Sequence, residues 1–117
     1  MKKKTNKDQQ ENYLERKPKR HEAIAWAKDE KGIVTLDIEN TGFFNRLVQK
    51  FFHKPKVTHI HLDEMGSFVW PIMDGEKDII AIGKEVEEQF GEKANPLYER
   101  LAKFFQVLDS YHFITWN

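Results

Sequence analysis

Apolar and polar residues alternate along three stretches of the chain, Glu22–Lys28, Ile33–Glu39 and Val57–Leu62. A period of two residues is typical of strands that bury one face, so the sequence predicts three β-strands. The segment Asp29-Glu30-Lys31-Gly32 lies between the first two stretches and has the composition of a tight turn. The first two strands are therefore expected to form a β-hairpin.

The segments on either side of the third strand show a helical period instead. Phe43–Phe52 carries apolar side chains on one broad face and basic side chains on the other, which predicts an amphipathic helix inserted before that strand. We expect this helix to dock on the sheet, although a basic amphipathic helix also suits a membrane surface or a partner. After the strand, Asp63 is placed to cap a helix over Glu64–Met73, and Pro71 within it predicts a kink or an early end.

The C-terminal part of the chain contains two further helical patterns. Asp78 is expected to cap a helix that runs to Phe90. The pair Asn95-Pro96 predicts the start of the last helix, with Asn95 as the N-cap and Pro96 in the first turn. The apolar residues of the last helix that recur with the helical period, and are therefore expected in the core, are Leu97, Leu101, Phe104 and Leu108. A short final strand is expected within Phe113–Trp116.

This order of elements describes an α+β domain of the winged-helix kind. It has a small three-stranded antiparallel sheet followed by a three-helix bundle, with the extra amphipathic helix before the third strand. A length of 117 residues suits a single core, and we expect one domain over residues 21–117. Residues 1–20 are expected to be a disordered basic tail, because they are strongly polar and hold eight Lys or Arg against three acids, a net charge of +5.

The composition argues against several classes of protein. The chain has no cysteine, which removes disulfides and thiol chemistry. It shows neither a secretory signal nor an apolar run long enough to span a bilayer, so we expect a cytoplasmic protein without a membrane partner. Residues 21–117 hold eleven Lys or Arg and sixteen acids, a net charge of −5, which disfavours a nucleic-acid surface on the folded part. A winged-helix DNA-binding protein is retained as the alternative function.

No catalytic apparatus is recognisable, so we predict that the protein is not an enzyme and needs no cofactor. The chain has neither a P-loop nor a dinucleotide-binding glycine pattern, and no nucleophile elbow surrounds a serine. His59 and His61 stand two residues apart on the third predicted strand, where they would point the same way and could share a metal ion with His53 or His112. Exposed strand positions also accept histidine readily, and we predict no metal site.

The segment Ile60–Gly91 combines several short motifs in a fixed order. An apolar strand is followed by Leu-Asp-Glu-Met-Gly-Ser-Phe-Val-Trp, then by an Asp-Gly turn, a capped helix that begins on aliphatic residues, and a closing Phe-Gly. In this order and spacing the segment resembles the PqqD-like family, and the helix that follows is similar to the last helix of that family. Pro71 and the Phe-rich insert Phe43–Phe52 depart from the family pattern, and residues 1–20 lie outside it.

The resemblance implies a precursor-peptide recognition element, a small winged-helix domain that grips the leader of a ribosomally made precursor peptide. Such a domain presents the leader to a modifying enzyme, often a radical SAM enzyme. The leader adds as a strand beside the third strand of the sheet and packs against the last helix. A homodimer that pairs through the same exposed strand is a further expectation. The residues to which the resemblance assigns peptide binding are Val57, Thr58, His59, Ile60, His61, Leu62, Tyr98, Arg100, Leu101, Ala102, Phe105 and Leu108.

The last helix has a second apolar flank beside its core stripe, and Tyr98 and Phe105 are its large members. This flank could be the wall against which the peptide packs. Arg100 and Lys103 would then stand near the rim, where they could meet an acidic leader. The alternative is that Tyr98 and Phe105 pack on Trp116 or on the Phe-rich helix.

Overall fold

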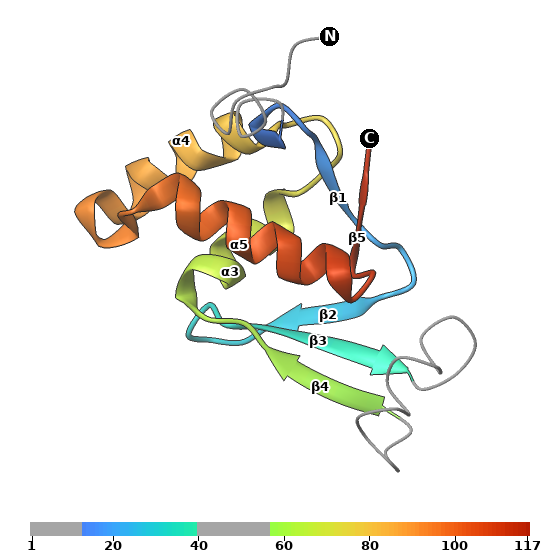
Figure 1. Ribbon diagram of the computed structural model, residues 1–117. Coiled ribbons are helices and arrows are strands. Elements are labelled where there is room, and N and C mark those ends of the chain that lie inside the picture. The colour runs from blue at the N-terminus through green and yellow to red at the C-terminus, as the bar shows by residue number, and fades with distance from the viewer. Residues whose placement is uncertain (1–12, 40–56) are drawn as a thin grey trace, which may run out of the picture.

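The computed structural model describes residues 13–39 and 57–117, and its centre is a three-stranded antiparallel sheet (Figure 1). The strands are β2 (Ala25–Lys28), β3 (Val34–Glu39) and β4 (Val57–His61), in the spatial order β2-β3-β4. The predicted hairpin and third strand are confirmed. The α-helices all lie on one face of this sheet (Figure 1).

The middle strand β3 shows why the sheet has one buried face. Its residues Val34, Leu36 and Ile38 are at most 1% exposed, whereas Thr35 and Asp37 between them lie on the open face. Successive side chains of a strand point to opposite faces, so all three apolar residues meet the helices. The alternation seen in the sequence therefore sets which face of the sheet the helices cover.

Helix α3 (Glu64–Val69) begins where the sequence predicts it and ends earlier. Asp63 caps it, because its Oδ1 accepts a hydrogen bond of 2.7 Å from the N–H of Gly66. Pro71 lacks a backbone donor, and the chain continues as a short 3-10 helix, η2 (Trp70–Ile72), instead of an α-helix. The early end expected from the proline is confirmed.

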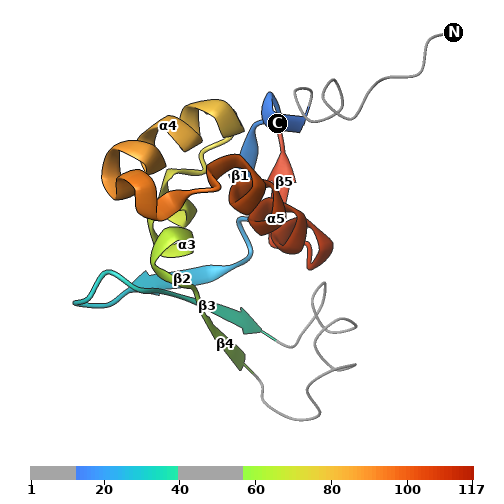
Figure 2. The same cartoon turned by 60° about the vertical axis from the view of Figure 1, so that its left-hand side comes forward.

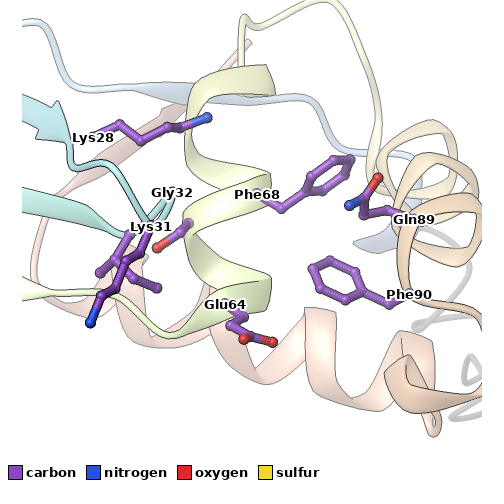
Figure 3. A pocket seen from close by; sticks show the side chains of 9 residues that line it. Lys28, Lys31, Gly32, Glu64, Phe68, Gln89 and Phe90 are labelled. Carbon is purple, nitrogen blue, oxygen red and sulfur yellow. The ribbon is translucent and has the colours of Figure 1, made fainter.

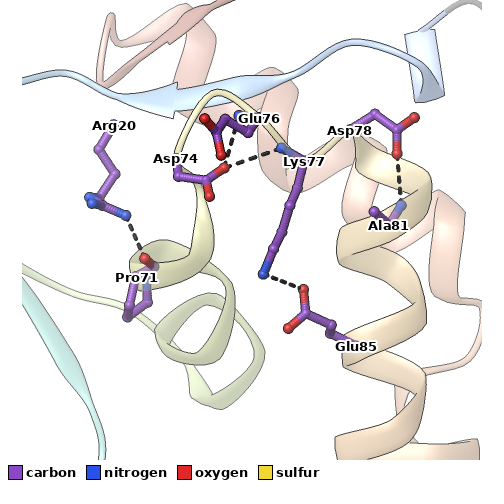
Figure 4. Close-up of polar contacts among 8 residues, drawn as sticks. All are labelled: Arg20, Pro71, Asp74, Glu76, Lys77, Asp78, Ala81 and Glu85. Atoms are coloured by element: carbon purple, nitrogen blue, oxygen red, sulfur yellow. Dashed lines mark hydrogen bonds and ion pairs between the residues drawn. The ribbon is translucent and has the colours of Figure 1, made fainter.

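Two longer helices follow, α4 (Ile79–Phe90) and α5 (Leu97–Ser110), with the short 3-10 helix η3 (Gly91–Ala94) between them. Asp78 caps α4 as predicted, since its Oδ1 accepts a hydrogen bond of 2.8 Å from the N–H of Ala81 (Figure 4). The helices of the C-terminal part are thus those that the periodicity predicts.

The start of α5 differs from the prediction by one residue. Pro96 is the N-cap, with an extended backbone, and no side chain caps the helix, so Asn95 does not have the capping role expected of it. A proline ring fixes φ and donates no hydrogen bond, which suits the residue just before the first turn as well as the first turn itself.

A two-stranded antiparallel ribbon joins the beginning and the end of the folded body. β1 (Pro18–Arg20) pairs with β5 (Ile114–Trp116), and Pro18 is fully buried. The final strand expected from the sequence is confirmed. The expected tail is corrected, because residues 13–20 belong to the folded body. β1 has only three residues and is held by main-chain bonds to β5, so it leaves no apolar pattern in the sequence.

Arg20 ties this ribbon to the end of η2. Its guanidinium donates hydrogen bonds of 2.6–3.1 Å to the carbonyls of Trp70, Pro71 and Met73 (Figure 4 shows the one to Pro71). All three bonds come from Nη1, so one terminal nitrogen of Arg20 holds the end of η2 against β1.

The loop between η2 and α4 is held by two acidic side chains. Asp74 accepts hydrogen bonds from the N–H groups of Glu76 and Lys77, at 2.9 and 3.1 Å, and these bonds lower the pKa of its carboxyl group. Lys77 reaches the other way and pairs with Glu85 of α4 at 2.9 Å (Figure 4). The loop is therefore fastened to the helix that follows it.

The residues before β1 cover Trp116. The rings of Tyr13 and Trp116 lie 5.6 Å apart, and the guanidinium of Arg16 lies 4.0 Å from the centre of the Trp116 ring. On its other side Trp116 contacts Phe105 of α5, at 6.3 Å between ring centres. The N-terminal segment therefore adds to the core around the C-terminal half of α5.

The predicted amphipathic helix Phe43–Phe52 lies outside the described residues, as do residues 1–12. In the part of the chain that the structure describes, no helix is long and apolar enough to cross a membrane.

Helices α4 and α5 approach each other closely at Gly83. A Cβ atom on Gly83 would lie 2.6 Å from Cε1 of Tyr98, and the Tyr98 hydroxyl donates a hydrogen bond of 3.3 Å to the carbonyl of Ile80. Only a residue without a side chain leaves room for the tyrosine ring at this point.

Gly83→Ala is expected to destabilise the protein, because the added methyl group meets the ring of Tyr98. Overpacking lowers stability by about 1–3 kcal/mol, which exceeds the gain in helix propensity of about 0.5–1 kcal/mol. In a Tyr98→Ala background the same substitution is expected to raise the free energy of unfolding, since the clash is gone. Urea unfolding of the four proteins measures both signs, and a stabilising Gly83→Ala in the wild-type background would contradict the close approach.

The free energy of unfolding is expected to fall less at alkaline pH in Tyr13→Phe than in the wild type. Burial raises the pKa of Tyr13 to about 12 from its ordinary value of 10.0. Tyr13 therefore stabilises the fold fully below about pH 10, and this contribution is lost as the pH rises towards 12. Denaturant unfolding at about pH 9 and about pH 11 checks this. An equal loss of stability in the wild type and the variant would show that the Tyr13 hydroxyl is not buried.

Candidate functional site

Strand β4 is an edge strand. β3 pairs with one side of it, and no strand in residues 13–39 or 57–117 pairs with the other side. The N–H of Leu62 donates to the carbonyl of Val34 at 2.9 Å, which sets the alternation of the ladder. Bonded and non-bonded residues alternate in an antiparallel pair, so Val57, His59 and His61 turn their N–H and C=O groups to the open side. This side of β4 is a row of backbone donors and acceptors available to another strand.

The side chains of β4 divide between the two faces of the sheet as predicted. Ile60 and Leu62 are partly buried against the core, and Thr58 is only 9% exposed. His59 and His61 lie on the open face and are exposed. A strand added to β4 would therefore have one side towards the helices and one towards solvent.

The flank of α5 that carries Phe104 reaches the end of this edge. A Cβ atom on Gly66 of α3 would lie 2.9 Å from Cε1 of Phe104 and 3.4 Å from Cβ of Leu62, so Phe104 packs where β4 runs into α3. Both ribbon views place α5 above the sheet, with β4 at its outer edge (Figures 1 and 2). The residues that share this flank recur at i, i+4, i+7 and i+11 and are Arg100, Phe104, Val107 and Tyr111.

Exposed apolar side chains gather on this flank. Val107 is 48% exposed and Tyr111 is 42% exposed. Among the described residues the other large apolar side chain with such exposure is Trp26 on β2. We call the open side of β4 together with Arg100, Phe104 and Val107 of α5 and its C-cap Tyr111 the β4–α5 surface. It combines unpaired backbone groups with an apolar surface, which is what binding of an extended peptide requires.

The roles predicted for two neighbouring phenylalanines are exchanged in the structure. Phe105 is fully buried and packs on Trp116, so it cannot form the wall of a site, and its alternative packing on Trp116 is confirmed. Phe104, expected in the core stripe, is only partly buried and faces β4. Neighbouring helix residues point 100° apart, and both phenylalanines border the stripe, so periodicity alone does not distinguish them.

The other α5 residues assigned to the site also need correction. Leu101 is fully buried and Leu108 is 4% exposed, so both belong to the core. Tyr98 packs on Gly83 of α4, on the opposite flank of the helix from Phe104. Ala102 lies on the same flank as Tyr98, four residues along. These side chains are not part of the β4–α5 surface.

Arg100 is on the β4 side of the helix. It lines a cavity of about 270 Å³ together with Asp63 and Glu64, the residues that follow β4. Its guanidinium donates a hydrogen bond of 2.8 Å to the carbonyl of Lys93, which holds it at the edge of this cavity. Arg100 therefore places a positive charge beside the carboxylates of Asp63 and Glu64, where a strand paired with β4 would leave the sheet.

The two histidines of β4 are each bound to β3. Nδ1 of His59 lies 2.5 Å from Oδ1 of Asp37, and Nδ1 of His61 lies 2.7 Å from Oγ1 of Thr35. Both pairs are direct cross-strand neighbours on the open face of the sheet. The described residues contain no group of three or more His, Cys, Asp or Glu side chains that could hold a metal ion.

A further cavity, of about 340 Å³, lies between the hairpin turn and the helices α3 and α4 (Figure 3). Phe68 and Phe90 lie together on the side away from the hairpin, in edge-to-face contact with their ring centres 5.6 Å apart. Lys28 and Lys31 border it on the hairpin side and Glu64 at the start of α3. Its charges are mixed, so no class of charged ligand is favoured there.

Comparison with protein families shows to which family the chain belongs. The family described as "Coenzyme PQQ synthesis protein D (PqqD)" matches residues 32–114. The chain belongs to the PqqD family. This confirms the resemblance seen in the sequence motifs. Comparison with curated proteins gives no significant match, and comparison with solved structures gives none either.

The PqqD family consists of non-catalytic accessory proteins that act as peptide-binding partners in PQQ biosynthesis. The family match ends before Thr115 and begins after β2, so β1 and β2 lie outside it. β3, β4 and the α-helices, which contain the β4–α5 surface, lie within the match.

Three residues of the surface were missed in the sequence, namely Phe104, Val107 and Tyr111. Their spacing from Arg100 is the signal that could have found them. Arg100 was expected at the rim, and a stripe drawn from it at i+4, i+7 and i+11 passes through all three. Two apolar stripes on one helix predict two packing partners, one in the core and one outside it.

Phe105→Ala is expected to lower the free energy of unfolding by about 3–5 kcal/mol, because it removes a fully buried ring. Val107→Ala is expected to change it by less than about 0.5 kcal/mol, because the side chain is half exposed. Denaturant unfolding of both variants measures this difference. Comparable losses would mean that the two flanks of α5 are assigned the wrong way round.

Proposed function

We propose that the protein binds the leader of a ribosomally made precursor peptide by strand addition at β4 and presents it to a modifying enzyme. The observation that carries the proposal is a strand edge with which no described residue pairs, combined with exposed apolar residues on one flank of α5. The membership of the PqqD family supports a peptide as the ligand.

The backbone of the peptide pairs with Val57, His59 and His61. These residues turn their N–H and C=O groups outwards, so the bonds form whatever the sequence of the peptide. Main-chain bonds of this kind contribute affinity, while selection among peptides comes from the side chains.

The side chains of the peptide that face the helices pack on Phe104, Val107 and Tyr111. Burial of Val107 and Tyr111, which are 48% and 42% exposed in the free protein, favours the complex through the hydrophobic effect. Arg100 meets an acidic residue of the leader beyond the end of β4, and this contact affects selection and association rate more than affinity.

The modifying enzyme that receives the leader is proposed to be a radical SAM enzyme, as the family resemblance implies. Within the described residues no catalytic side chains are assembled at the β4–α5 surface, and the role of the chain is to hold the peptide. A second copy of the chain that pairs through β4 would compete with the leader for the same backbone groups.

Val107→Asp is expected to weaken peptide binding by about tenfold or more, because it places a charge in the apolar contact. The matched control is Gln106→Asp, which adds the same charge at the neighbouring, exposed position on another side of α5. Peptides selected from a random display library on the full-length protein serve as ligands, and calorimetry measures the affinities.

In isotope-labelled protein, such a peptide is expected to shift the backbone resonances of residues 57–62 and 100–111. Shifts confined to residues 1–20, or equal losses of affinity in the two α5 variants, would overturn strand addition at β4.

A further inference from the structure

The hydroxyl group of Thr58 is buried without a partner. Thr58 is 9% exposed, and its Oγ1 has no hydrogen-bond partner in the described part of the chain. Its cross-strand neighbour is Ile38, which is 1% exposed and offers no polar side-chain atom. An unpaired buried hydroxyl destabilises a fold, and native proteins keep few of them, so this one calls for an explanation.

Thr58 stands at a particular position with respect to the open side of β4. Its own backbone groups point to β3, and its neighbours Val57 and His59 turn theirs outwards. A peptide strand added antiparallel to this side would place one residue directly opposite Thr58 in a non-hydrogen-bonded pair. Side chains approach each other most closely in such pairs, and threonine forms cross-strand hydrogen bonds there. Rotation about the Cα–Cβ bond of Thr58 carries its hydroxyl towards that position.

We propose that Thr58 selects leader peptides with a hydroxyl or amide side chain opposite it, and that apolar side chains precede this residue at two and four positions. This inference rests on the proposed function. The apolar side chains lie opposite Ile60 and Leu62, which are partly buried on the same face of β4. An aliphatic residue opposite Thr58 leaves the hydroxyl unpaired and is selected against.

The test uses a random peptide display library on the full-length wild type and on Thr58→Val, which replaces the hydroxyl by a methyl group of similar size. The wild type is expected to enrich peptides with the apolar-x-apolar-x-polar pattern. Thr58→Val is expected to enrich peptides with an apolar residue in place of the polar one. A wild-type peptide is expected to bind Thr58→Val about tenfold more weakly and Thr58→Ser within about threefold.

A double-mutant cycle isolates the contact. Replacing the polar residue of the peptide by alanine is expected to weaken binding about tenfold to the wild type and hardly at all to Thr58→Val. The urea midpoint of the free Thr58→Val protein is expected to be unchanged or higher, which separates the lost contact from misfolding. The same enriched pattern on both proteins, or equal losses in the cycle, would overturn the role of Thr58.

Failure of the proposed function looks different. In that case the library enriches no peptide on either protein, or the enriched peptides bind Val107→Asp as well as they bind the wild type.

Discussion

Packing of Phe105 against Trp116 sets the rotation of α5 about its axis, and the candidate surface depends on that rotation. Each residue turns the helix by 100°, so the burial of Phe105 places Phe104 on the side of β4. Trp116 is itself held by β1 and by Tyr13, which lie before the part of the chain that matches the family. Residues at the beginning of the folded body thus help to determine which flank of its last helix carries Phe104 and Val107 and stays partly exposed.

The described sheet has two outer strands, and their chemistry differs. On β2 the alternation of the ladder turns the backbone groups of Trp26 and Lys28 outwards, and the guanidinium of Arg20 lies 5.7 Å from the Trp26 ring. Lysine at a strand edge opposes the addition of another strand. The open side of β4 contains neither lysine nor proline and lies beside an apolar helix flank. These differences favour β4 as the edge that receives a peptide.

Much of the fold could be predicted because short stretches of the sequence, such as helix caps and alternating residues, identify its elements. Asp63 and Asp78 act as helix caps at the expected positions, and the alternation in β3 identifies its buried face. β1 could not be predicted, since three residues without a period are recognisable only through their distant partner β5.

For the site, the sequence could identify the strand and not the helix flank. A period of two residues predicts the strand and also which of its side chains face the core. His59 and His61 are exposed, as this alternation predicts. On α5 both neighbours of the core stripe are apolar, and only tertiary contacts decide which of them is covered. The contact between Phe105 and Trp116, which lie eleven residues apart in the chain, determines that Phe105 is the covered one.

Pairing of β1 with β5 also brings the beginning and the end of the folded body side by side. Pro18 and Trp116 are register partners, so the two ends of the body leave it at one place, while β4 lies at the other side of the molecule (Figure 1). An enzyme domain joined covalently to either end would be attached at the same point. In both arrangements the strand edge would stay accessible, and the peptide would be held at the same distance from the point of attachment.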